Sequence, residues 1–163
     1  MIIFQNVNGE ELSKHLAGLQ NFIDKKFKGE FYNSTKEKPL FDVIHFESIL
    51  NGSAICISHS VNDGEYGGKY IIIWNSDIGK VESYYFSTGG EIKVSKARIH
   101  NKEITIEDDY LKNENGIKKV KKIYKLNDIG QLENHIEYLL NNLWVKTHEM
   151  NYVENDSVKI IFR

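Results

Sequence analysis

Apolar and polar residues alternate along most of this chain with a period of two, the spacing of β-strands that bury one face. The alternation starts at Phe27 and continues to Val153, in runs separated by turn residues at roughly the 8–12-residue spacing of sandwiches and barrels. The runs predict ten strands, at 27–32, 41–50, 54–61, 69–75, 80–87, 92–99, 103–110, 117–126, 132–139 and 144–153.

The segments between these runs contain the residues that tight hairpins require. They are Asn51-Gly52, Asp63-Gly64, Asp77-Ile78-Gly79, Thr88-Gly89-Gly90, Asn115-Gly116 and Asp128-Ile129-Gly130. Asn-Gly and Asp-Gly supply the positive φ of hairpin turns. Helical crossovers are missing, which excludes a parallel sheet. A ten-strand meander does not stay flat. We therefore expect a mainly β protein, an antiparallel up-and-down meander closed into a barrel.

Two segments also show helical spacing. Before the strands, leucine and isoleucine recur at three and four residues, at Leu12, Leu16, Leu19 and Ile23. Acidic residues in the first turn and lysines in the last suit the helix dipole, so one N-terminal helix is predicted over 10–25. The segment 131–142 fits a helical stripe as well, but it lies between a hairpin signal and Trp144, and we favour a strand there.

Length and composition indicate a single domain of ordinary globular type. The chain has 163 residues, of which 40% are hydrophobic and 27% charged. We divide it into an N-terminal arm and helix (1–26), the barrel (27–153), and a C-terminal tail or short strand (154–163). The formal net charge of -2 provides no basic field for nucleic acid.

Targeting signals and cysteine chemistry add little to the prediction of function. No apolar run approaches the roughly 20 residues of a membrane helix, and the N-terminus does not resemble a secretory signal, so we expect a soluble, cytoplasmic protein that binds no membrane. The single cysteine, Cys56, lies between isoleucines and is interpreted as a buried, unreactive thiol on the strand face opposite His59. A lysine run is interpreted as a solvated strand face; it comprises Lys118, Lys119, Lys121 and Lys122. No cofactor motif is present, and no cofactor is predicted.

Short motifs add a family resemblance. They are Lys28-Gly29-Glu30-Phe31 after the helix, the segment 74–80 that begins with Trp74, Phe86-Ser87-Thr88-Gly89-Gly90, and the aromatic closing stretch 144–152. This pattern resembles the lipocalin-like (calycin) β-barrel domains, with Phe31 where those domains have tryptophan. The resemblance covers 27–152 and implies a cavity inside the closed sheet that takes a small, largely apolar molecule.

Histidine is paired with glutamate at a spacing of two on two of the predicted strands. His45 and Glu47 share one strand face, and His135 and Glu137 share another. His148 lies on the last strand, next to the strand of His135. If these faces point inward, the side chains would orient a polar ligand group, bind a metal or act as general acid and base. If the faces point outward, they are solvated charge pairs. We expect no metal site, and haem ligation by a histidine is a further alternative.

Three other residues complete the predicted ligand-binding set. Arg98 stands on a strand in a chain that otherwise uses lysine, and it could clamp a carboxylate or form a rim salt bridge. Trp74 and Tyr124 are candidates for the cavity wall, although strand aromatics also serve as core.

The leading functional hypothesis is binding of a small apolar or amphipathic molecule without catalysis. The alternatives are a small enzyme of isomerase, cyclase, dehydratase or decarboxylase type, and a protein-interaction domain. The sequence does not determine the oligomeric state, and a homodimer is one option.

Overall fold

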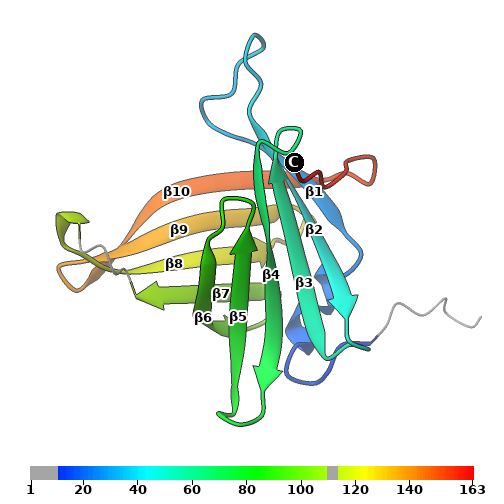
Figure 1. The fold of residues 1–163 in the computed structure, drawn as a ribbon, viewed down its shortest axis with the longest axis vertical. Helices are drawn as coiled ribbons and strands as arrows, with labels where there is room; N and C mark the ends of the chain where they lie inside the picture. The colour runs from blue at the N-terminus through cyan, green and yellow to red at the C-terminus, as the bar shows by residue number, and fades with distance from the viewer. Residues whose placement is uncertain (1–10, 110–113) are drawn as a thin grey trace, which may run out of the picture.

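The computed structural model describes residues 11–109 and 114–163. Within them, ten antiparallel strands pair in chain order, and β10 pairs with β1 to close the barrel (Figure 1). The strands are β1 (Lys26–Glu30), β2 (Phe41–Ile49), β3 (Ala54–Val61), β4 (Tyr66–Asn75), β5 (Lys80–Ser87), β6 (Ile92–Ile99), β7 (Glu103–Asp109), β8 (Ile117–Leu126), β9 (Leu132–Leu140) and β10 (Leu143–Glu154). A short 3-10 turn, η2 (Glu114–Gly116), precedes β8. The predicted closed antiparallel meander is confirmed.

Most predicted strand bounds agree with the structure within one residue. Two strands are exceptions: β1 ends earlier than predicted, at Glu30, and β4 begins earlier, at Tyr66. Tyr110, the predicted last residue of its strand, lies outside the described residues, as do residues 1–10. The segment 132–140 is a strand and not a helix, so the two-residue alternation of apolar and polar side chains is the correct interpretation there.

The N-terminal helix is shorter than predicted and of another type. It is the 3-10 helix η1 (Ala17–Phe22). Leu16, Leu19 and Phe22 are fully buried. Their spacing of three matches the three residues per turn of a 3-10 helix, which stacks them on one face. The prediction assigned the last buried position to Ile23, as the 3.6-residue period requires, and that assignment is wrong.

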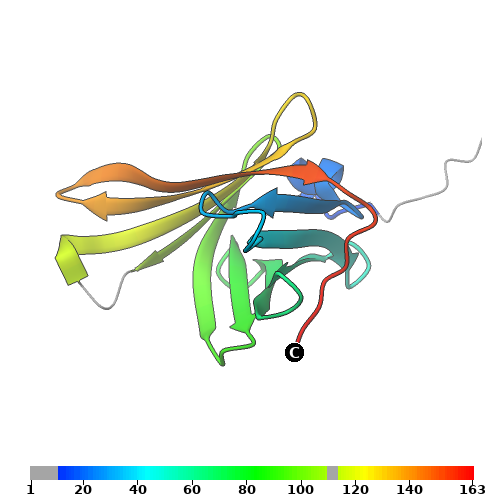
Figure 2. The same cartoon turned by 90° about the horizontal axis from the view of Figure 1, so that it is seen from above.

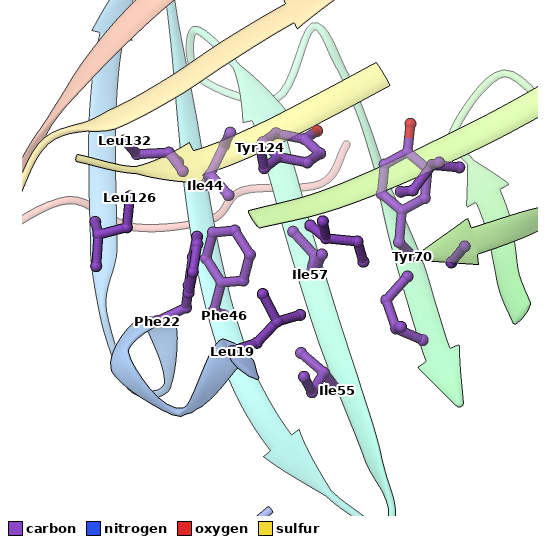
Figure 3. Packing of buried hydrophobic residues seen from close by; sticks show 14 of the residues in the cluster. Leu19, Phe22, Ile44, Phe46, Ile55, Ile57, Tyr70, Tyr124, Leu126 and Leu132 are labelled. Atoms are coloured by element: carbon purple, nitrogen blue, oxygen red, sulfur yellow. The ribbon is translucent and has the colours of Figure 1, made fainter. Parts of the chain in front are cut away.

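One end of the barrel is filled by a core of apolar and aromatic side chains. η1 lies against the turns at this end, where the Ser13 N–H donates to the Gly52 carbonyl at 2.9 Å. Figure 3 shows Phe22 beside Phe46, with Leu19 between Phe46 and Ile55, in the buried cluster. Aromatic and aliphatic side chains therefore occupy the lumen at the η1 end.

The barrel wall is incomplete on one side. In Figure 1, β8, β9 and β10 run across the view while β3, β4 and β5 run along it, and Figure 2 shows the same divergence from above. The two halves meet at β6 and β7, which pair only between Lys96–Ile99 and Ile104–Glu107. Within residues 11–109 and 114–163, the first half of β6 therefore has no strand partner on its β7 side, and the wall opens there.

The outer face of the barrel carries the cysteine and the end of the chain. Cys56 is buried, with its Sγ 3.6 Å from the Ser58 Oγ on the same face, which confirms the predicted burial. The tail from Asn155 onward forms no strand and crosses this face, where the Ile161 N–H donates to the Ser60 Oγ at 3.2 Å. No helix in the described part of the chain is long and apolar enough to cross a membrane.

Candidate functional site

Two ionisable side chains are buried in the lumen beside the apolar core. Asp42 and His59 are each 7% exposed. Asp42 lies on the same face of β2 as Ile44, and His59 on the same face of β3 as Ile57, so both point inward. The Asp42 Oδ1 lies 3.6 Å from the His59 Nδ1, an ion-pair contact just beyond hydrogen-bond length. The Tyr152 hydroxyl donates to the Asp42 Oδ2 at 2.9 Å.

From His59 a chain of hydrogen bonds leads to the rim of the barrel. The His59 Nε2 lies 3.0 Å from the Tyr85 hydroxyl, which lies 3.0 Å from the Tyr66 hydroxyl. Tyr66 donates to the Glu91 Oε2 at 2.8 Å. Glu91 is exposed and also forms an ion pair with Lys93, Nζ to Oε1 3.6 Å. The buried acid–imidazole pair is thus connected to a carboxylate in contact with solvent.

Two glycines make room for this network. A Cβ on Gly68, which pairs with His59, would lie 2.7 Å from the Tyr85 hydroxyl oxygen. A Cβ on Gly29, which pairs with both Asp42 and Tyr152, would lie 2.8 Å from the Tyr152 ring. A side chain at either position would displace a tyrosine that contacts the buried pair. The Gly29 of the family-like motif therefore has a structural role at this site.

The number of available protons determines which group donates in each hydrogen bond between Glu91 and His59. Because the Glu91 carboxylate only accepts, the single proton of Tyr66 is committed to it, and Tyr66 must accept from Tyr85. Tyr85 then has no proton left for His59, so the His59 Nε2 donates to the Tyr85 oxygen. The Nδ1 faces the Asp42 Oδ1, and that contact is favourable only when a proton lies between the two atoms. Among the described residues, the Asp42 Oδ1 has no hydrogen-bond partner.

Burial sets the ionisation of the tyrosines in the lumen. It raises the pKa of Tyr85, an effect reinforced by the hydrogen bond with Tyr66. Burial also raises the pKa of Tyr152, to which the Asp42 charge adds, and that of Tyr124. At the rim, the hydrogen bond from Tyr66 lowers the pKa of Glu91, with a further contribution from Lys93. At neutral pH the tyrosines are therefore neutral donors and Glu91 is an anion.

We expect Tyr85→Phe to lower the free energy of unfolding by about 1–3 kcal/mol, because it leaves His59 and Tyr66 without their shared partner in a buried site. Tyr84→Phe is the matched control. The Tyr84 hydroxyl donates only to Glu82, at 2.8 Å on the partly exposed outer face, and its loss should cost less than about 1 kcal/mol. Urea unfolding of both variants measures the difference. Equal losses would contradict the role of the network.

A cleft lies where β6 and β7 separate. Its volume is about 710 Å³. Lys93, Ser95, Asp108, Val120 and Tyr138 line it from strand faces that are continuous with the lumen, and Glu91 lies at its rim. The cleft therefore shares Glu91 with the hydrogen-bonded chain that ends at His59.

The two predicted histidine–glutamate pairs form, but on the outside of the barrel. The His45 Nδ1 lies 3.5 Å from the Glu47 Oε2, and the His135 Nε2 lies 3.5 Å from the Glu137 Oε1. Ile44 and Phe46 point into the core, so His45 and Glu47 point outward. The same alternation, from Leu132 and Asn134, places His135 and Glu137 outside. Their role in ligand binding stays a prediction, and the structure does not bring them to the cleft.

The other four predicted residues are divided between both faces. Tyr124 is buried in the lumen, and Trp74 lies at the η1 end, stacked on His15 at 3.7 Å between ring centroids. His148 pairs with Ile136, which pairs with Lys122, so it lies on the concave face, where it is exposed. Arg98 is on the outer face and forms a salt bridge with Glu107 at 2.7 Å. Among the described residues, no cluster of three or more His, Cys, Asp or Glu side chains could hold a metal ion.

The sequence contained signals for the inward residues that were not used. Asp42 occupies an alternation with Ile44 and Phe46, so a carboxylate on an apolar face could have been noticed. In the lysine run, strict alternation places Lys118 and Lys122 on the strand face opposite Lys119 and Lys121, so the run does not occupy one face. Lys122 faces inward, with its Nζ 3.4 Å from the Tyr70 hydroxyl, and the solvated-face interpretation is wrong for it. The pairing of His59 with Tyr85 depends on register and has no local signal.

Comparison with known proteins identifies the fold. The crystal structure of Rv2717c from M. tuberculosis matches 88% of this chain and 99% of its own, with a TM-score of 0.54 and 12% sequence identity. At that identity the likeness shows a common barrel fold. No description of a known protein family matches the sequence, and no curated protein matches it.

Proposed function

We propose that this protein binds a small amphipathic molecule in the cleft between β6 and β7, with the polar part of the ligand directed toward the lumen. The observation that carries the proposal is the cleft of about 710 Å³, which is within the roughly 300–1,000 Å³ of small-molecule sites. A lipocalin-like carrier role without catalysis and without a cofactor is part of the proposal, and a cytoplasmic location stays a prediction.

The lining of the cleft supports an amphipathic ligand. Ile92 and Val94 lie along its outer side and are 72% and 59% exposed, so apolar surface is available to cover a ligand. Val120 and Tyr138 add apolar area on the opposite side, while Lys93 and Ser95 supply polar contacts. The η1 end of the lumen is packed, which directs the proposal to the cleft instead of the barrel centre.

Acid–base catalysis is the second candidate, supported by the hydrogen-bonded chain through His59. Asp42 and His59 are both more than nine-tenths buried, and neither lines the cleft. A substrate in the cleft would touch Glu91 and not the pair itself. Binding is therefore the function that the geometry supports better.

The test uses N-phenyl-1-naphthylamine, a neutral probe whose fluorescence rises in apolar sites. We expect Val94→Lys to weaken its binding about fivefold, equivalent to about 1 kcal/mol of lost apolar contact. Val153→Lys is the matched control, since Val153 is also 59% exposed but lies on β10 away from the cleft lining. Equal affinities in the two variants, or no binding to the wild-type protein, would contradict the proposal.

A further inference from the structure

Lys122 is a cation inside the barrel without an anionic partner. Its Nζ lies 3.4 Å from the Tyr70 hydroxyl and 5.3 Å from the ring centroids of both Tyr70 and Tyr124. No carboxylate of the described residues lies within 4.0 Å of it, whereas its neighbours Lys119 and Lys121 form ion pairs with Glu107 and Glu137. An inward cation with only neutral oxygens and rings around it leaves part of its charge uncompensated.

The buried carboxylate of Asp42 does not pair with Lys122. It accepts a hydrogen bond from the Tyr152 hydroxyl, and its Oδ1 lies 3.6 Å from the His59 Nδ1. Burial acts to lower the pKa of Lys122, and the oxygens of Tyr124 and Tyr70 outweigh this and raise it well above its ordinary value. Lys122 is therefore an ammonium ion at neutral pH.

Lys122 is not itself part of the cleft lining, but it lies beside two residues that are. Val120, two residues before it on the same face of β8, lines the cleft, and so does Tyr138, which pairs with Val120. On the concave face of β8, Tyr124 is buried, whereas Lys122 and Val120 are partly exposed. In Figure 3 the hydroxyl oxygens of Tyr70 and Tyr124 point away from Leu19 and Phe22. The Lys122 Nζ lies 3.4 Å from the Tyr70 oxygen.

We propose that the polar end of the ligand is an oxyanion of the carboxylate or sulfonate class, bound by the Lys122 Nζ together with the Tyr70 hydroxyl. This inference rests on the proposed function, because it assigns the polar half of the same ligand. The apolar part lies between Val120 and the β6 side of the cleft, and the anion supplies the partner that the ammonium lacks. The Tyr70 hydroxyl can donate to the anion because Lys122 donates to its oxygen.

The test compares two probes with the same ring system. 1-Anilinonaphthalene-8-sulfonate carries an anionic group that N-phenyl-1-naphthylamine lacks. We expect Lys122→Met to weaken sulfonate binding about tenfold or more and to leave binding of the neutral amine within about twofold. Lys122→Arg keeps the charge and should retain most of the sulfonate affinity. Lys125→Met, at an exposed position on the outer face of the same strand, should change neither affinity.

The outcomes separate the two proposals. If both probes bind Lys122→Met as they bind the wild type, the anion site is wrong and the cleft proposal stands. If neither probe binds the wild type, both proposals fail. Because replacing an unpartnered inward cation with an apolar side chain removes a desolvation cost, the unfolding temperature of Lys122→Met should not fall. A lower unfolding temperature with unchanged sulfonate affinity would show that Lys122 is structural and would overturn the inference.

Discussion

Replacing Phe46 with alanine should lower the free energy of unfolding by about 3–5 kcal/mol, the range observed for large-to-small changes of buried aromatic residues. Phe46 is fully buried and stands at the centre of the core. Its ring centroid lies 5.0 Å from that of Phe22 and 6.1 Å from those of Phe27 and Tyr124. These partners come from η1, β1 and β8, so the cavity would loosen contacts across the whole barrel end.

Phe86→Ala is the control for this measurement. Phe86 is 47% exposed on the outer face of β5, and its truncation removes the same atoms without opening an enclosed cavity. We expect it to cost less than about 1 kcal/mol. Urea unfolding at one temperature, with the slope compared between variants, gives both values. A loss at Phe46 no larger than that at Phe86 would contradict the assigned core.

The fold could be predicted from the sequence because two independent local signals agree at most positions. Alternation of apolar residues and the glycine-containing turns together located β3, β5, β6 and β8 at their observed bounds. An up-and-down meander needs no further information, since each strand pairs with the next. Closure follows from strand number and twist, and the pairing of β1 with β10 is its consequence.

The type of the N-terminal helix was harder to predict, because apolar residues three and four positions apart are compatible with an α-helix and with a 3-10 helix. Leu16 and Leu19 fit both periods, and the next buried position, Phe22 or Ile23, separates them. Phe22 is buried against Phe46, so tertiary contact with the barrel core decided the period. A local pattern of six residues does not contain that information.

The site could be predicted only in part, because alternation shows which residues share a face but not which face is the lumen. His45 with Glu47, and His135 with Glu137, were recognised correctly as pairs, yet both pairs point outward. The inward face of β2 was marked instead by Ile44 and Phe46, and Asp42 belongs to it. The contact of His59 with Tyr85 joins residues that are 26 positions apart, and it depends on the space left by Gly68.

Alkaline pH should unfold this protein through the tyrosines of the lumen. Burial raises the pKa of Tyr85, Tyr124 and Tyr152 above the ordinary value of about 10, so the folded state keeps three protons that the unfolded chain releases. Because the folded state binds more protons in this range, stability is fully present below about pH 10 and falls as the pH rises. Each tyrosine contributes a slope of about 1.4 kcal/mol per pH unit, and the three together about 4.

Two measurements test this expectation. In a spectrophotometric titration, at most six of the nine tyrosines should ionise before the barrel unfolds, and the remainder should ionise together with unfolding. Urea unfolding at several pH values above about 10 gives the slope directly, and Tyr85→Phe should reduce that slope by about 1.4 kcal/mol per pH unit, the contribution of one tyrosine. Ionisation of all nine tyrosines while the barrel is still folded would show that the lumen admits hydroxide, and the hydrogen-bonded chain from Glu91 to His59 would then not be shielded from solvent.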